Sequence, residues 1–400
     1  MSSSTKTVSV KALSDFSLVA GGPLYQLWRR AHLSGDEMQM TVRRMVVLAL
    51  VAWLPLLLLS LLDGHAWGTS VALPFLKDVE THAKLLVAIP LLIAAELTAH
   101  QRLSKVVRQF LEQELIRDVD RQRFETAIDS AMRLRNSVVA ELLLIAFVYL
   151  VGIAFIWRTQ STLDISSWYS DSTGGSLRLS RAGWWAACVS LPLAQFLLVR
   201  WYFRIFVWGR FLWQVSRIRL NLVPTHPDGM AGLHFLSRSR RAYTQLLLAQ
   251  GATLAGMIAN RIFYTGANLM SFKVELFGMA LFMVFAILGP LLVFTPQLRR
   301  TRRKGLDECG VLGQRYACEF EEKWFRGGAP AGESLLGSAD IQSLADLRNS
   351  VLVVRGLEYV PFTFKHVISL ALTVLLPVAP LLLTTFSVEQ LVDRLLKVVL

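Results

Sequence analysis

Long apolar segments recur along this chain, separated by polar segments that are rich in arginine. About 20 helical residues, at a rise of 1.5 Å each, cross the hydrocarbon core of a bilayer. The pattern therefore predicts an all-α protein, a polytopic transmembrane helical bundle of about seven spans with cytoplasmic amphipathic helices. The expected spans are 45–62, 83–100, 138–157, 184–203, 245–265, 274–295 and 367–386.

The fifth expected span, 245–265, is the weakest, because Gln250, Asn260 and Arg261 interrupt it. Its run of small residues, GATLAGMIA, predicts close packing against other helices rather than against lipid. If this segment failed to cross the membrane, every downstream segment would change sides. The side of the C-terminus therefore depends on it.

The distribution of Lys and Arg predicts the orientation, because these residues accumulate in cytoplasmic loops. With seven spans and a cytoplasmic N-terminus, the four inner segments carry 6, 8, 7 and 11 Lys and Arg. The outer loops and the tail carry few. The first apolar run begins only near residue 45, after a polar stretch, so we expect it to stay in the mature protein as a span.

These considerations predict six regions. A cytoplasmic N-terminal segment comes first, followed by a transmembrane hairpin, a cytoplasmic helical segment, a transmembrane bundle containing a cytoplasmic loop (204–244), a second cytoplasmic segment, and a last span with an amphipathic tail. Their expected bounds are 1–44, 45–100, 101–137, 138–295, 296–366 and 367–400.

Composition agrees with a membrane protein: 54% of residues are hydrophobic and only 18% are charged, against about 25% in a typical soluble domain. The net charge of +13 does not by itself indicate nucleic acid, because in a membrane protein the placement of Lys and Arg matters more than their sum. The expected partner is the lipid bilayer. Anionic lipids are a further candidate partner, through the run Arg299, Arg300, Arg302, Arg303 and Lys304.

Three charged residues within expected spans fall at one depth near the cytoplasmic face, namely Glu96, Glu141 and Arg200. Charges inside spans are costly, so they are candidate functional residues by default. A buried cluster in which Arg200 neutralises one or both carboxylates is a candidate binding site. The alternative is an inter-helix ion pair with a purely structural role, or side chains that reach the interface.

The most distinctive loop is 221–233, in which Pro224 and Pro227 hold His226 and Asp228 on a stiff connection. His226 and Asp228 are candidate catalytic residues, as an acid and base pair, or candidate metal ligands. Glu96 and His100, one helical turn apart, would complete the metal site. The alternative is a rigid turn whose Asp228 caps the following helix. No Walker loop, dinucleotide fingerprint, zincin helix or nucleophile elbow appears, so the sequence leaves any cofactor unknown.

Two segments, PTHPDGMAGLHFL and LLGSADIQSLADLRNSVLVVRGLEYVPF, resemble a family of uncharacterised bacterial polytopic inner-membrane proteins. Ala231 and His234 stand where that family has Gly. The resemblance implies a multi-pass protein of the cell inner membrane and implies no activity, substrate or catalytic residue.

Three functions remain open at this point. The first is small-solute transport or membrane sensing, in which the layer of Glu96, Glu141 and Arg200 lines a cavity. The second is a membrane-embedded enzyme that uses His226 and Asp228. The third is an envelope scaffold, with the amphipathic helices of 101–137 as partner surfaces. The intramembrane charges favour the first, while the substrate and the oligomeric state stay undetermined.

Overall fold

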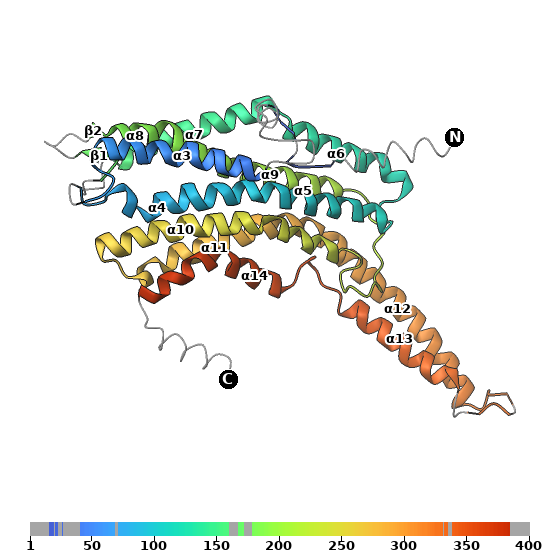
Figure 1. The fold of residues 1–400 in the computed structure, drawn as a ribbon. Helices are drawn as coiled ribbons and strands as arrows, with labels where there is room; N and C mark the ends of the chain where they lie inside the picture. Colours follow the sequence, from blue (N-terminus) through green and yellow to red (C-terminus); the bar gives the residue numbers. More distant parts are fainter. Residues whose placement is uncertain are drawn as a thin grey trace.

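In a computed structural model, long helices lie side by side in a bundle, and a pair of helices extends from it as an arm (Figure 1). The predicted tail helix and most of the predicted N-terminal segment fall outside the residues that the structure describes. The described residues are 16–19, 21–22, 26, 41–68, 71–159, 167–171, 178–330, 332–334 and 338–384.

Each of the seven predicted apolar segments lies in a helix over its described residues, which confirms an all-α bundle. Within the described residues, six helical stretches are long and apolar enough to cross a membrane, and a seventh is possible if the pair α6 and α7, bent by 45°, counts as one span. The stretches are α3 (Thr41–Leu62), α4–η2–α5 (Val79–Glu112), α8–η4–α9 (Arg181–Val215), η5–α10 (His234–Thr265), η6–α11–η7–α12 (Leu269–Trp324) and α14–η8 (Phe364–Thr384).

Within these stretches the α-helices are separated by short 3-10 or π segments. Both π segments, η2 (Ala83–Ala88) and η4 (Ala186–Ser190), are followed by helices with a proline in the first turn, Pro90 and Pro192. Proline has no N–H to donate, so the regular ladder of hydrogen bonds is interrupted there. The remaining bounds are α4 (Val79–His82), α5 (Ile89–Glu112), α6 (Arg121–Arg135), α7 (Val138–Thr159), α8 (Arg181–Trp185), α9 (Leu191–Val215), η5 (His234–Tyr243), α10 (Thr244–Thr265), α11 (Lys273–Leu288), η7 (Gly289–Phe294), α12 (Thr295–Trp324), α13 (Ala339–Arg355) and α14 (Phe364–Leu375).

The two ends of the bundle differ. At one end lies a small hairpin of two-residue strands, β1 (Ser170–Asp171) and β2 (Arg178–Leu179), paired antiparallel. At the other end lie α6 and the arm formed by α12 and α13 (Figure 1). The predicted polar segments 101–137 and 296–366 therefore meet at one end of the molecule. We call this the polar end.

The weak fifth segment forms an unbroken helix, α10, with 56% of its apolar window buried. A Cβ at Gly251 would lie 2.0 Å from the carbonyl oxygen of Val374 in α14, and a Cβ at Gly256 would lie 2.9 Å from Cα of Glu80. This confirms the predicted close packing, because only glycine lets the backbones approach so far. Asn260 is also explained, since its Nδ2 donates to Oδ1 of Asp78 over 2.7 Å.

The predicted amphipathic helices in 101–137 are present, as the end of α5 and as α6. Their apolar sides are buried against the rest of the chain, and Phe110 packs against Phe124 with ring centroids 5.8 Å apart. These side chains belong to the main hydrophobic core of the described residues. They are therefore not available as the partner surface that the scaffold hypothesis required.

Candidate functional site: a buried layer of charged side chains

Five charged side chains from four helices meet inside the bundle. α5 contributes Glu96, α7 contributes Glu141, α3 contributes Arg44, and α9 contributes Arg200 and Arg204. Arg200 and Arg204 are one helical turn apart and so lie on the same face of α9. We call this group the charge layer.

Glu96 is the centre of the charge layer, with only 3% of the residue exposed. Its Oε1 accepts a hydrogen bond from Nη2 of Arg204 at 2.7 Å and lies 3.5 Å from Nη1 of Arg200. Its Oε2 forms an ion pair with Arg44. A buried carboxylate is costly unless opposite charges and hydrogen bonds compensate it, and three guanidinium groups do so here.

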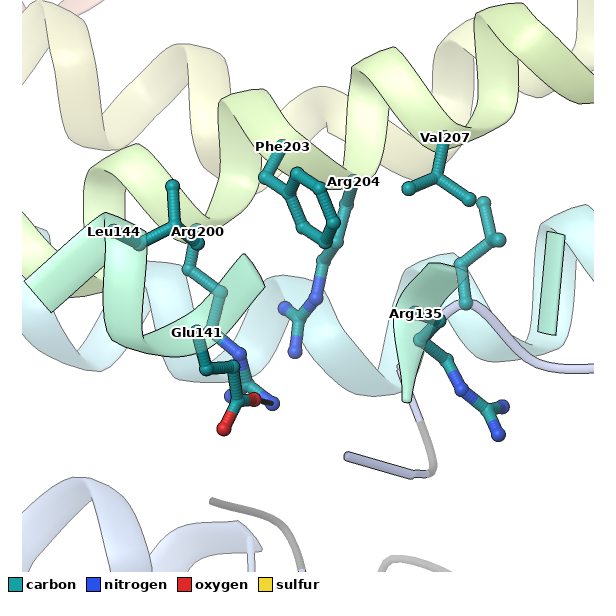
Figure 2. A pocket seen from close by; sticks show the side chains of 8 residues that line it. Arg135, Glu141, Leu144, Arg200, Phe203, Arg204 and Val207 are labelled. Carbon is teal, nitrogen blue, oxygen red and sulfur yellow. Dashed lines mark ion pairs between the residues drawn. The ribbon is translucent and has the colours of Figure 1, made fainter. Parts of the chain in front are cut away.

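Arg200 bridges the two carboxylates. Its Nη2 lies 3.4 Å from Oε1 of Glu141, while its Nη1 faces Glu96. Figure 2 shows Arg200 reaching Glu141 of α7, with Arg204 beside it on α9. The structure thus brings together the three residues that the sequence placed at one depth, in the ion-paired arrangement expected. Ligand binding by them stays a prediction.

Two members of the charge layer were missed in the sequence. Arg204 was assigned to a cytoplasmic loop, although its spacing of four from Arg200 places both on one helical face. Arg44 was assigned to the N-terminal segment, but α3 begins at Thr41, so Arg44 is inside the helix and 2% exposed. Its position at the start of the first span was the available signal. The helix thus begins four residues before the expected span, which starts at residue 45.

The charge layer is closed in this structure. The cavity beside it, lined by Glu141, Arg200, Arg204 and the side chain of Arg135, has a volume of about 10 Å³ (Figure 2). A cavity of this size holds about one water molecule. Among the residues that the structure describes, the charged groups are therefore packed against one another and line no open path for a solute.

The loop 221–233 is held by Asp228. The Oδ1 of Asp228 accepts hydrogen bonds from the amides of Met230 (2.8 Å) and Gly232 (3.1 Å), and its Oδ2 accepts from the amide of His234 (3.1 Å) at the start of η5. Burial alone would raise the pKa of Asp228, but these amides, with the His226 ring, hold the pKa below its ordinary value. These bonds support the structural interpretation, a turn whose aspartate caps the next helix.

The candidate metal site does not assemble. His226 does contact Asp228, with 2.9 Å between Nδ1 and Oδ1. Glu96, however, is enclosed by arginines, and no group of three or more His, Cys, Asp or Glu among the described residues could hold a metal ion. Glu96 and His100 belong to α5 inside the bundle, whereas His226 and Asp228 belong to the loop 221–233. These four residues therefore do not form one ligand set.

No protein-family model, no curated protein and no solved structure matches the chain. The resemblance of its two polar segments to a bacterial inner-membrane family therefore stays a prediction. The described residues themselves establish a helical bundle with six to seven stretches long and apolar enough to cross a membrane, as a multi-pass membrane protein has.

Proposed function

We propose that this chain is a multi-pass protein of the bacterial inner membrane, with its N-terminus in the cytoplasm, and that it acts in membrane sensing. The excess of Lys and Arg in the segments of the polar end supports a cytoplasmic location for that end. The seven apolar segments, each found in a helix, support the membrane location.

The observation that carries the sensing role is the charge layer. It ties four helices together through ion pairs, so a movement of one helix has to break or exchange a buried ion pair. A buried polar network couples distant parts of a protein where it has two discrete arrangements, and exchange of carboxylate partners among the three arginines is the second arrangement that the sensing role requires.

A physical connection runs from the charge layer to the arm. α9 carries Arg200 and Arg204, and its C-terminal end is tied to α12 by Gln297, whose Nε2 donates to the carbonyl oxygens of Ser216 (2.6 Å) and Ile218 (2.8 Å). α9 also packs along η7, the segment that leads into α12. A displacement of α9 therefore moves the base of the arm.

Sensing is favoured over small-solute transport because the cavity at the charge layer, about 10 Å³, admits no solute. The enzyme hypothesis loses its support at Asp228, whose oxygens are engaged by three backbone amides.

A scaffold role is a second candidate function, and it rests on the arm instead of on the amphipathic helices of 101–137. The arm extends away from the bundle (Figure 1) and exposes apolar side chains such as Val311 and Phe325.

Anionic lipids are the proposed membrane partner of the arginine run at the base of the arm. Arg302 is engaged, since its Nη2 donates to the carbonyl oxygen of Arg355 over 2.6 Å, and Lys304 pairs with Glu308. Arg300 and Arg303 have no ion pair among the described residues and are exposed. These two side chains carry the proposed attraction to headgroups.

The sensing role is tested by Glu141→Gln, which removes one charge from the layer. In the single-cysteine background Cys188→Ser/Cys309→Ser, a spin label on Cys318 of α12 reports the position and mobility of the arm. We expect Glu141→Gln to shift the label spectrum in lipid nanodiscs, with unchanged protein level in the membrane, because α9 relaxes and moves α12.

Glu275→Gln is the matched control, since Glu275 is an exposed residue in the first turn of α11, away from the charge layer. It should leave the spectrum as in the parent protein. An unchanged spectrum in folded Glu141→Gln protein, with only its thermal stability reduced, would show that the charge layer only stabilises the fold. That result would contradict the sensing proposal.

A further inference from the structure

A second cavity, of about 550 Å³, opens between α5, η5 and α14. It is lined by five basic side chains that come from two different elements. α5 contributes Arg102 and Lys105, and η5 contributes Arg238, Arg240 and Arg241. We call it the basic cavity. Its members are drawn from three predicted segments, so sequence spacing alone did not reveal it.

The basic cavity contains no compensating acid. No Asp or Glu lines it, and none of its five basic side chains forms an ion pair among the described residues. The charge layer is the opposite case, since each of its arginines faces a carboxylate. Five like charges around one concave space repel one another, and solvent screens this repulsion only in part, because Arg240 is half-buried while the other four are exposed. An anion is therefore the expected occupant.

Further polar groups in the basic cavity are suited to an anion. His234 and His366 lie there with ring centroids 6.2 Å apart, and Gln109 and Ser237 complete its polar lining. Nδ1 of His234 and Nε of Arg240 are buried and have no hydrogen-bond partner among the described residues. Buried nitrogen atoms without partners are costly, and a small rotation of either side chain toward the cavity would let a protonated nitrogen donate to a bound anion.

We propose that the basic cavity binds a phosphate-bearing anion, either free or as a lipid headgroup. Guanidinium groups hold phosphate oxygens through paired hydrogen bonds, and a phosphate carries up to two negative charges, which suits five cations better than one carboxylate does. The volume of about 550 Å³ lies within the usual range for small-ligand sites, roughly 300 to 1,000 Å³.

The arginine content of cytoplasmic loops does not explain this arrangement by itself. A topogenic signal needs only that positive residues remain on one side of the membrane. The arginine run on the surface of α12 meets that requirement without any cavity. The basic cavity instead directs side chains from neighbouring helices to one concave space, because α5 and η5 pack side by side. The inference does not depend on the charge layer, so either proposal can fail alone.

The test uses the full chain in nanodiscs of phosphatidylcholine alone, with pyrophosphate as the free probe. Calorimetry measures its affinity for the parent protein and for Lys105→Gln/Arg238→Gln, in which both substituted side chains are exposed residues of different elements. We expect this pair to weaken binding by about tenfold or more, since charge-assisted hydrogen bonds are lost. The control pair Arg315→Gln/Arg348→Gln removes the same charge from exposed positions on the arm, outside the cavity and outside the arginine run, and should change affinity less than about twofold.

The lipid source is tested in nanodiscs that also contain phosphatidic acid, by counting the lipid molecules that stay bound in native mass spectrometry. Pyrophosphate binding that depends on the cavity pair indicates a soluble ligand, and cavity-dependent retention of phosphatidic acid alone indicates a headgroup. If the first pair fails to fold, Arg102→Gln/Arg241→Gln decides in its place. Binding of neither probe, or equal weakening by the cavity and control pairs, overturns the inference.

Discussion

At the scale of single residues, the charge layer shows what a buried ion costs. Glu96 is 3% exposed and faces Arg44, Arg200 and Arg204. The depth of Glu96, Glu141 and Arg200 in their spans was enough to predict that they meet. Their further partners were not predictable, because an arginine near a span end can equally reach the interface. Only the packing of α3 and α9 against α5 turned Arg44 and Arg204 inward.

The substitution Glu96→Gln leaves three arginines facing a neutral amide. Removing one partner of a buried pair typically costs about 3 to 5 kcal/mol, because an uncompensated charge stays buried. We expect Glu96→Gln to lower the free energy of unfolding by about that amount, measured by denaturant titration in detergent micelles.

Glu275→Gln is the control for Glu96→Gln, since the exposed Glu275 has no ion pair among the described residues. It should lie within about 0.5 kcal/mol of the parent protein. Equal stability of Glu96→Gln and Glu275→Gln would show that the arginines of the charge layer do not depend on the carboxylate of Glu96.

At the scale of elements, α10 shows that a segment with a weak apolar pattern can form a helix at the centre of the bundle. Its small residues lowered its apparent hydropathy but allow α14 and α4 to approach closely, at Gly251 and Gly256. Gln250 donates to the hydroxyl of Tyr202, and Asn260 pairs with Asp78. The polar residues that made this segment doubtful are thus partners of other helices. In the absence of an aqueous driving force between helices, such contacts hold spans together.

Gly251→Ala tests this packing. The new Cβ would lie 2.0 Å from the backbone oxygen of Val374, and backbone cannot move aside without separating α10 from α14. We expect a loss of roughly 1 to 3 kcal/mol of stability, from overpacking, measured by the same denaturant titration.

Gly278→Ala is the matched control for Gly251→Ala, because Gly278 lies inside α11 with no atom near the position of a new Cβ. It should be neutral or stabilising by up to about 1 kcal/mol, since alanine has the higher helix propensity. A similar effect of both substitutions would contradict close packing at Gly251.

At the scale of the whole molecule, the polar segments meet at one end of the bundle (Figure 1). The arm lies at that end, and Cys318 on α12 is exposed there, whereas Cys188 lies in η4 within an apolar stretch. In the proposed orientation the arm is cytoplasmic, because six spans, an even number, separate it from the cytoplasmic N-terminus when α10 crosses fully.

Single-cysteine variants test the orientation. A membrane-impermeant maleimide should label Cys318, with Cys188 and Cys309 replaced by Ser, in inside-out vesicles and not in intact spheroplasts. Cys188, retained alone, is the control and should react with neither preparation, since it lies within the bilayer. Labelling of Cys318 in intact spheroplasts would show that the topology is the inverse of the proposed one. The C-terminus would then be cytoplasmic, and a reporter fused after Leu400 should be active only in the cytoplasm.

The apolar pattern by itself determined that this chain is helical and where its long helices lie, because a span needs a run of about 20 apolar residues whatever surrounds it. It also determined that Glu96, Glu141 and Arg200 share one depth. Only the tertiary structure decided which faces turn inward, and hence the addition of Arg44 and Arg204 to the charge layer, the separation of His226 from Glu96, and the basic cavity between α5 and η5. These features depend on helix rotation and packing between segments far apart in sequence, which periodicity along one segment does not specify.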